Sequence, residues 1–267
     1  MFDAGLQSEL QRARGRGEVS FAGRPTRLTR LAQEGCAKIL LPKTYGRPRE
    51  AVIVNTSGGI TGGDRLRYAA SVGPAAAATL TTQAAERVYR AATGEGRIEV
   101  RLEVGAEGRL DWLPQETILF EGGRLARTLE VDLSEGADVL IVESVILGRG
   151  AMGEVLEDAA LTDQWRVRRE GRLVFAEALR LAPPLSALRG PGALRDARAF
   201  ATVALISDRA EDRLTEARAA LPEGAMASAW RGALVCRFLD PDPARLRRGL
   251  AAFLTQFNGP LPRVWQV

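Results

Sequence analysis

The sequence predicts a mainly β protein, a meander of mostly antiparallel strands with two or three helices. Apolar and polar residues alternate with a period of two over the first two-thirds of the chain, which indicates sheets with one wet face. Two further segments are apolar without interruption, as is typical of strands covered on both faces. Glycine-containing breaks separate these segments at roughly the spacing of hairpins.

The strands follow from these patterns in order. The first apolar run is "AVIVN" (51–55) and the second is "VLIVESVIL" (139–147). Between them, every second residue is apolar in "RIEVRLEV" (97–104) and in "TLEVDL" (128–133). The breaks are "VGAEGRL", "FEGGRL" and "LSEGADV".

The clearest helix is expected near the C-terminus. Asp242 is a good N-cap, Pro243 suits the first helical position, and "NGP" (258–260) ends the helix. We expect a second helix over 208–221 and a third, short one over 82–89. The C-terminal helix carries a wide apolar stripe, which favours packing in the core: Leu246, Leu250, Phe253, Leu254 and Phe257.

Composition narrows the classes of function. The chain has no histidine, so Ser-His-Asp and Cys-His nucleophiles are excluded. The net charge of +4 comes from scattered arginines without aromatic interleaving, which argues against nucleic acid. No apolar run approaches the ~20 residues that a membrane span needs, and no secretory signal is recognisable. Two distant cysteines, Cys36 and Cys236, favour a cytoplasmic protein. With no repeat or linker, we expect a single domain over 1–267.

A glycine-rich loop, "NTSGGITGGDRL" (55–66), follows the first apolar run. Gly58 and Gly63 are spaced like the outer glycines of a phosphate-binding loop. Asp64-Arg65 stands where that loop needs Lys and Ser/Thr, and a carboxylate there would repel phosphates. The loop therefore either makes a tight connection or leaves room in a confined space into which Asp64 projects. The loop glycines are Gly58, Gly59, Gly62 and Gly63.

Two more acids occupy apolar faces of expected strands. Glu143 shares the face of Val139 and Val145, and Glu177 shares that of Phe175 and Leu179. A buried carboxylate must be compensated or take up a proton. Either each pairs with a buried arginine, or the acids line a wet internal passage.

Four motifs in order resemble the urease accessory proteins of the UreD (UreH) family. The resemblance runs from about Gly17 to Trp265. Glu86-Arg87 departs from the family pattern, since many relatives have Thr-Lys there. The motifs are "TSGGITGGDRL", "TTQAAERVYR", "WLPQETILFEGGR" and "ESVILGRGAMGE", and the ending "PLPRVW" also looks like that of the family.

The resemblance implies an elongated fold of stacked sheets, β-helix-like or sandwich-like. It also implies a non-enzymatic maturation factor that binds apo-urease and a helical F-type accessory protein, which recruits a G-type GTPase carrying nickel. The family is thought to enclose a tunnel for nickel. No nucleic acid or membrane partner is implied.

The residue types favour a protein that passes nickel on over one that stores it. Ni²⁺ prefers imidazole and thiolate, so a chain without histidine is poorly equipped for a tight nickel site, and we expect no tightly bound cofactor. A conduit needs weak serial contacts that let the ion leave again. We therefore expect Asp64, Glu143 and Glu177 to guide hydrated nickel in transit.

The remaining motif residues are interpreted as partner contacts or as structural residues. Arg149 and Glu154 are candidates for an ion pair that shapes a loop. The set comprises Thr81, Thr82, Arg87, Tyr89, Arg90, Gly148, Arg149, Met152 and Glu154.

Two other functions stay open at this stage. One is a metallochaperone that binds nickel itself. The other is an acid-base enzyme that uses Glu143 and Glu177, although few exposed aromatics are available for a glycosidase cleft.

Overall fold

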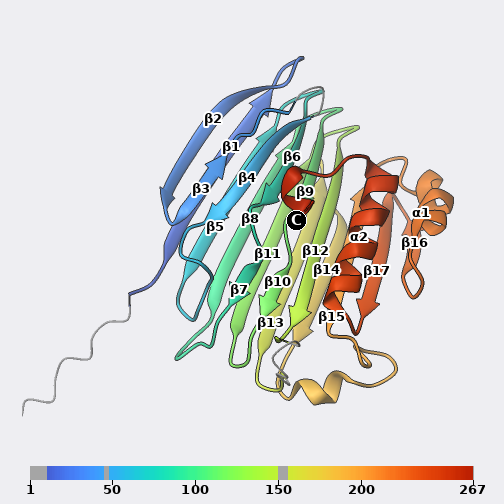
Figure 1. Ribbon diagram of the computed structural model, residues 1–267. Coiled ribbons are helices and arrows are strands. Elements are labelled where there is room, and N and C mark those ends of the chain that lie inside the picture. The colour runs from blue at the N-terminus through green and yellow to red at the C-terminus, as the bar shows by residue number, and fades with distance from the viewer. Residues whose placement is uncertain (1–10, 45–47, 150–155, 267) are drawn as a thin grey trace, which may run out of the picture.

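The computed structural model describes residues 11–44, 48–149 and 156–266. This part of the chain contains seventeen β-strands and two α-helices (Figure 1). The strands are β1 (Arg14–Ala22), β2 (Arg27–Gly35), β3 (Ala37–Leu40), β4 (Arg49–Asn55), β5 (Arg65–Val72), β6 (Ala77–Thr82), β7 (Glu86–Val88), β8 (Gly96–Val104), β9 (Arg109–Leu113), β10 (Thr117–Leu119), β11 (Arg124–Leu133), β12 (Asp138–Leu147), β13 (Ala160–Arg169), β14 (Arg172–Leu181), β15 (Ala199–Ile206), β16 (Met226–Trp230) and β17 (Ala233–Asp240). The helices are α1 (Leu214–Ala220) and α2 (Pro243–Asn258), with short 3₁₀ helices η2 (Leu185–Leu188), η3 (Glu211–Arg213) and η4 (Arg263–Trp265).

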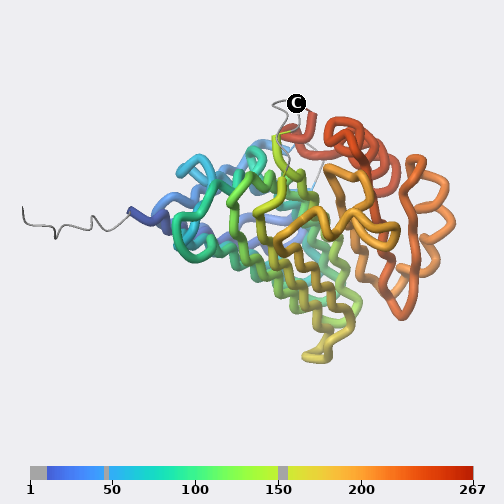
Figure 2. Tube along the Cα trace, turned by 90° about the horizontal axis from the view of Figure 1, so that it is seen from below, coloured from blue at the N-terminus to red at the C-terminus, as the bar shows by residue number. Residues whose placement is uncertain are grey.

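The strands form two stacked sheets. Sheet A has the order β14-β13-β11-β8-β5-β1-β2, and sheet B has the order β16-β17-β15-β12-β9-β6-β4-β3, with β7 and β10 beside its main path. The chain alternates between the sheets through β4–β5, β6–β8, β9–β11 and β12–β13. It is thus a β-solenoid of about four turns (Figure 2). The expected mainly β, stacked-sheet fold is confirmed.

The expectation of mostly antiparallel pairing is wrong for the centre of both sheets. There β5, β8, β11 and β13 run parallel, as do β4, β6, β9 and β12. The glycine breaks do not fold the chain back onto its own sheet. They carry it across to the other sheet, as 133–139 does between β11 and β12. Antiparallel pairs occur only towards the ends of the sheets in the described chain, for example β1 with β2 and β13 with β14.

Two hydrophobic cores explain the two sequence patterns. One core lies between the sheets, and β8 sends alternate residues into it with a strictly alternating burial pattern. The other lies between the outer face of sheet B and the helices. Because β12 contributes to both cores, its apolar run is uninterrupted: Val139 and Ile141 pack inward, and Leu140 and Val142 pack toward α2.

Both major helix predictions are confirmed. The Asp242 carboxylate caps α2 by accepting from Ala244 N–H at 2.9 Å, and the five stripe residues are all buried. Helix α1 follows η3 within the expected range 208–221. None of the helices in the described residues combines the length and the apolar composition that a bilayer span requires.

The short helix expected over 82–89 is absent. That segment contains β7, whose backbone pairs in parallel with β10, and Val88 bridges to Ile60. Val88 is completely buried. Ladder hydrogen bonds and burial of this one side chain therefore override the weak helical pattern.

The packing of α2 generates a stability prediction. Phe253 is fully buried, with ring centroids 5.5 Å from Phe238 and 5.2 Å from Phe257. Phe253→Ala should lower the free energy of unfolding by about 3–5 kcal/mol, measured by urea denaturation. Gln256→Ala, on the exposed face of the same helix, is the matched control and should change it by less than about 0.5 kcal/mol. Equal effects of the two substitutions would contradict the packing described.

Candidate functional site: a polar layer between the sheets

Sheet B is interrupted in two adjacent turns. Residues 83–85 separate β6 from β7, and residues 114–116 separate β9 from β10. Strand β12 alone continues past this gap, pairing with β9 along its first half and with β10 along its second. Under the gap lies a cavity of about 170 Å³. Its polar lining includes Tyr68, Glu86, Gln115, Arg127 and Glu143.

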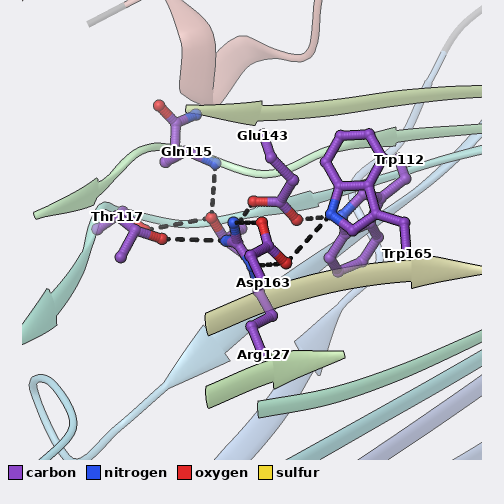
Figure 3. A network of polar contacts seen from close by, with 9 residues as sticks. Trp112, Gln115, Thr117, Arg127, Glu143, Asp163 and Trp165 are labelled. Carbon is purple, nitrogen blue, oxygen red and sulfur yellow. Dashed lines mark hydrogen bonds and ion pairs between the residues drawn. The ribbon is translucent and has the colours of Figure 1, made fainter. Parts of the chain in front are cut away.

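The floor of the cavity is a buried ion cluster (Figure 3). Arg127, Glu143 and Asp163 are each 4% exposed. The Arg127 guanidinium donates to both carboxylates, to Asp163 at 2.5 Å and 3.1 Å. Trp112 Nε1 donates to Glu143 at 2.9 Å, and Trp165 Nε1 donates to Asp163 at 3.1 Å. Every side chain of the cluster is thus held by several partners.

The charges of the cluster do not balance. One guanidinium faces two carboxylates, so full ionisation leaves a net negative charge in the core. Burial raises the pKa of Glu143 to about 7. Arg127 opposes this rise, and the neighbouring charge of Asp163 adds to it. Burial disfavours the charged form of Arg127, but Asp163 and Glu143 raise its pKa above the ordinary value. The arginine therefore stays charged, while burial favours the protonated form of Glu143.

A second acid, Glu86, faces the same cavity. Its carboxylate accepts from Asn55 Nδ2 at 3.0 Å. Burial raises the pKa of Glu86 to about 7, hydrogen bonds from Asn55 and the Arg87 backbone lower it, and the charge of Asp64 raises it. Burial together with Glu86 also raises the pKa of Tyr68. The cavity thus contains two carboxyl groups whose pKa values are raised above the ordinary value.

The glycine loop forms one wall of this cavity. Gly58 and Gly59 line it on the inside. Gly59 has φ +153°, and a Cβ there would lie 2.4 Å from the Tyr89 ring; a Cβ on Gly62 would lie 2.1 Å from Thr93 O. A side chain at either position would clash, so these glycines let the loop pack closely against its neighbours, as in the tight-connection alternative.

Asp64 lies on the outer side of this wall. Its carboxylate is 5% exposed and accepts from the backbone N–H groups of Ala13 and Thr61, each at 2.8 Å. It lines a surface hollow of about 360 Å³ that shares Gly59 with the inner cavity. Asp64 thus fastens the loop to the start of β1 and adds negative charge close to Glu86.

Glu177 lies farther along the space between the sheets and lines neither hollow. It forms an ion pair with Arg237, which also donates to Thr202 Oγ1 at 2.6 Å. Thr202 is the cross-strand neighbour of both Glu143 and Arg237. A row of polar side chains therefore leads across sheet B from the cavity floor to Glu177. Both acids placed on apolar faces pair with arginines. The partner of Glu143 is buried, as one of the two alternatives expected, whereas the Arg237 side chain is 50% exposed.

Comparison with known proteins identifies the family. The family model described as UreD urease accessory protein matches residues 12–266. The chain belongs to the UreD family of urease accessory proteins. It is 45% identical over 274 residues to the urease accessory protein UreD of Brucella suis, covering 99% of this chain and 98% of that one. It is 46% identical to the UreD proteins of Jannaschia sp. (100% of both chains) and Rhizobium leguminosarum bv. viciae (96% of both).

UreD proteins are non-enzymatic accessory factors of urease maturation, involved in nickel insertion into urease. Among the described residues, no three His, Cys, Asp or Glu side chains group in a way that could hold a metal ion. We call Glu86, Glu143, Asp163 and Glu177, together with their hydrogen-bonding partners, the polar layer. These carboxylates accept from arginines, tryptophans, Asn55 and a backbone amide.

The other UreD motif residues surround the gap in sheet B. Thr81 is fully buried and donates to Leu113 O at 2.7 Å, and Thr82 Oγ1 accepts from Gln115 N–H at 2.9 Å. These two threonines join the ends of β6 and β9, which lie on the same side of the gap. Arg87 is exposed at the rim of the cavity.

A second group of motif residues lies at the ends of β7 and β12. Tyr89 is 41% exposed, and its ring centroid lies 5.4 Å from that of Phe120 in a tilted arrangement. The Arg149 guanidinium lies over the Phe120 ring at 4.9 Å. Arg90 is exposed beside Gly122, and Gly148 N–H donates to Leu119 O at 2.9 Å. Met152 and Glu154 lie outside the described residues, and so does the suggested ion pair of Arg149 with Glu154.

Sequence reasoning missed Arg127, Asp163 and Glu86. Arg127 alternates with Leu125 and Leu129, and Asp163 alternates with Leu161 and Trp165, so the face counting that singled out Glu143 also identifies them. Glu86 had no such signal, because its segment was interpreted as a helix.

The ion cluster predicts a mutational asymmetry. Arg127→Met leaves two buried carboxylates without their cation and should cost about 3–5 kcal/mol of unfolding free energy at neutral pH. The triple variant Arg127→Met/Glu143→Gln/Asp163→Asn removes all the charges together and should be more stable than the single variant. Urea denaturation measures both. A triple variant less stable than Arg127→Met would show that charge compensation is not what holds the cluster.

Glu86 predicts a dependence of stability on pH. A folded-state pKa of about 7, raised from 4.5, means that the folded protein binds this proton more tightly than the unfolded chain. The contribution of Glu86 is therefore complete below about pH 4.5 and falls by up to ~3 kcal/mol as pH rises through 7. Glu86→Gln should flatten this part of the stability profile between pH 5 and 8, as measured by denaturation at each pH. Glu103→Gln, on the exposed face of β8, should leave the slope unchanged. An unaltered slope in Glu86→Gln would refute the assignment.

Proposed function

We propose that the protein passes nickel through the polar layer between its sheets toward the active site of urease. It does so as a cytoplasmic scaffold that binds apo-urease and an F-type accessory protein, and through the latter a G-type GTPase. The observation that carries this proposal is the arrangement of acids: Asp64 outside the glycine wall, Glu86 and Glu143 in the cavity behind it, and Glu177 farther along the same layer.

The chemistry of the layer suits transit. Carboxylate and hydroxyl oxygens bind Ni²⁺ weakly compared with imidazole and thiolate, and the chain offers no imidazole at all. Negative charge favours entry of a cation, while the competing contacts of each carboxylate limit how tightly the ion is held. Nickel is therefore cargo in this proposal and not a resident cofactor.

Along this route, two of the carboxylates are ion-paired with arginines. Arg127 occupies Glu143, and Arg237 occupies Glu177. An entering cation must displace or share these guanidinium contacts, and it is repelled by their charge. Protons leaving both Glu143 and Glu86 as the cation arrives would balance its two positive charges. Because the cation competes with an arginine at each of these carboxylates, its affinity for each of them is low.

The test separates passage from assembly. Asp64→Ala and Glu177→Ala should each lower urease activation severalfold in reconstitution with the accessory proteins and nickel, because each removes one carboxylate from the route. Co-purification should show both variants still bound to apo-urease and the F-type protein. Glu99→Ala removes a carboxylate from the outer face of sheet A and should activate normally. Wild-type activation by both route variants would eliminate the passage role.

Equilibrium dialysis of nickel against the isolated chain distinguishes passage from storage. We expect weak binding without fixed stoichiometry. A submicromolar, stoichiometric nickel site would instead identify a metallochaperone that holds its metal.

A further inference from the structure

The outer face of sheet A carries an unusual row of positive charge. In the described chain the two α-helices pack on sheet B (Figure 1). The outward residues of β1, β5 and β8 are exposed or half-buried. On these three neighbouring strands Arg14, Arg65 and Arg97 lie in register. We call these three residues the arginine row. All three side chains are exposed.

On the next rung Arg16 and Arg67 also lie opposite each other, but Arg16 contacts Glu18 at 3.3 Å. Arg67 contacts Glu99 at 2.9 Å, and Arg101 contacts Glu130 at 2.9 Å. Like charges directly opposite on neighbouring strands are unfavourable. In the arginine row, by contrast, only Arg97 has a paired acid, so its like charges are less compensated than those of the next rung.

The cations of the row are largely uncompensated. Arg97 contacts Glu95 at 3.1 Å. For Arg14 and Arg65, no side chain of the described residues forms an ion pair or hydrogen bond with the guanidinium. Two neighbouring guanidinium groups thus keep all their donors available, which is the arrangement that carboxylates recognise bidentately.

The spacing of the row selects the shape of the partner. Neighbouring strands lie ~4.8 Å apart, so the row repeats at that interval across the strands. Carboxylates three or four residues apart on one face of a helix have Cβ atoms ~5–6 Å apart, close to this repeat. Carboxylates on one face of an extended strand repeat at ~6.7 Å and fit less well.

The surroundings of the row also favour a protein partner. The adjacent rung is hollowed, with about 520 Å³ of space lined by Arg16, Gly17, Arg67 and Glu99 among others. A convex helix can settle into such a hollow. Nucleic acid is a poor fit, because the outward positions of β1, β5 and β8 include acids and no aromatic side chain.

We propose that the arginine row is the docking site of an acidic helix from a protein partner, lying across the strands of sheet A. This inference goes beyond the nickel route and does not depend on it, since the row and the cavity lie on opposite sides of the backbone of sheet A. Docking here leaves the gap in sheet B uncovered.

The test uses a helical peptide as the probe. The peptide is about 18 residues long with glutamates spaced i, i+4, i+7 and i+11 on one face, and its isomer has the same composition with the glutamates spread around the helix. Fluorescence anisotropy at low ionic strength measures binding to the whole protein. We expect the one-faced peptide to bind more tightly than its isomer, and its affinity to fall with added salt.

Matched variants locate the site. Arg14→Ala/Arg65→Ala should weaken binding of the one-faced peptide about tenfold, as expected for loss of two exposed charge contacts. Arg172→Ala/Arg180→Ala removes the same charge from exposed positions of β14, at the far edge of sheet A, and should weaken it less than about twofold. Circular dichroism confirms that both variants fold.

Three outcomes would overturn the proposal. They are equal losses in the two double variants, equal binding of the two peptide isomers, and tighter binding of a single-stranded DNA oligonucleotide that depends on Arg14 and Arg65. Because the peptide assay contains neither nickel nor urease, its result is independent of whether the route variants fail to activate urease.

Discussion

The burial of one guanidinium between two carboxylates is the interaction on which the interior of this protein depends. Arg127 projects from sheet A, Glu143 projects from sheet B, and Asp163 stands beside Arg127 on the next strand. The cluster therefore ties the two sheets together at a level where apolar packing would otherwise be continuous. Its charges also prevent that level from closing as a dry core, because an unbalanced buried charge demands a proton or a cation. Such a layer costs stability compared with leucine and valine, which makes a role in function the natural explanation for its presence.

The break in sheet B places this layer within reach of the surface. A parallel solenoid normally covers its interior with unbroken ladders, but here the chain leaves the ladder twice in succession, above Arg127 and Glu143. The backbone of the glycine loop lines the side of the same cavity. These features explain why the most distinctive motifs in the sequence lie close together in space although they are far apart in the chain. The polar layer provides oxygen atoms without a strong nickel ligand, which is the chemistry that the proposed passage of nickel requires.

The sequence predicted more of the local structure than of its connections. Alternation identified β8 and β11, and uninterrupted apolar runs identified β4 and β12, because burial on one or both faces leaves a direct trace in residue order. It could not give the parallel pairing, since a glycine break between two strands looks the same whether it turns within a sheet or crosses to the other one. Glu143 was found by the face it occupies, but its partners depend on which strands become neighbours. Arg127 and Asp163 are separated by 36 positions and are brought together only by the register of β11 and β13.

The roof of the cavity differs from the rest of the solenoid in what holds it shut. Across 114–116 the sheet has no ladder, and closure relies on isolated contacts: Gln115 Nε2 donates to Val264 O at 3.1 Å, and Trp265 Nε1 donates to Leu113 O at 3.0 Å. Glu116 adds a backbone hydrogen bond from Glu86 N–H and an ion pair with Arg247. Trp265 is itself buried in the core that α2 forms with sheet B, so the roof of the cavity depends on how the C-terminal segment packs there.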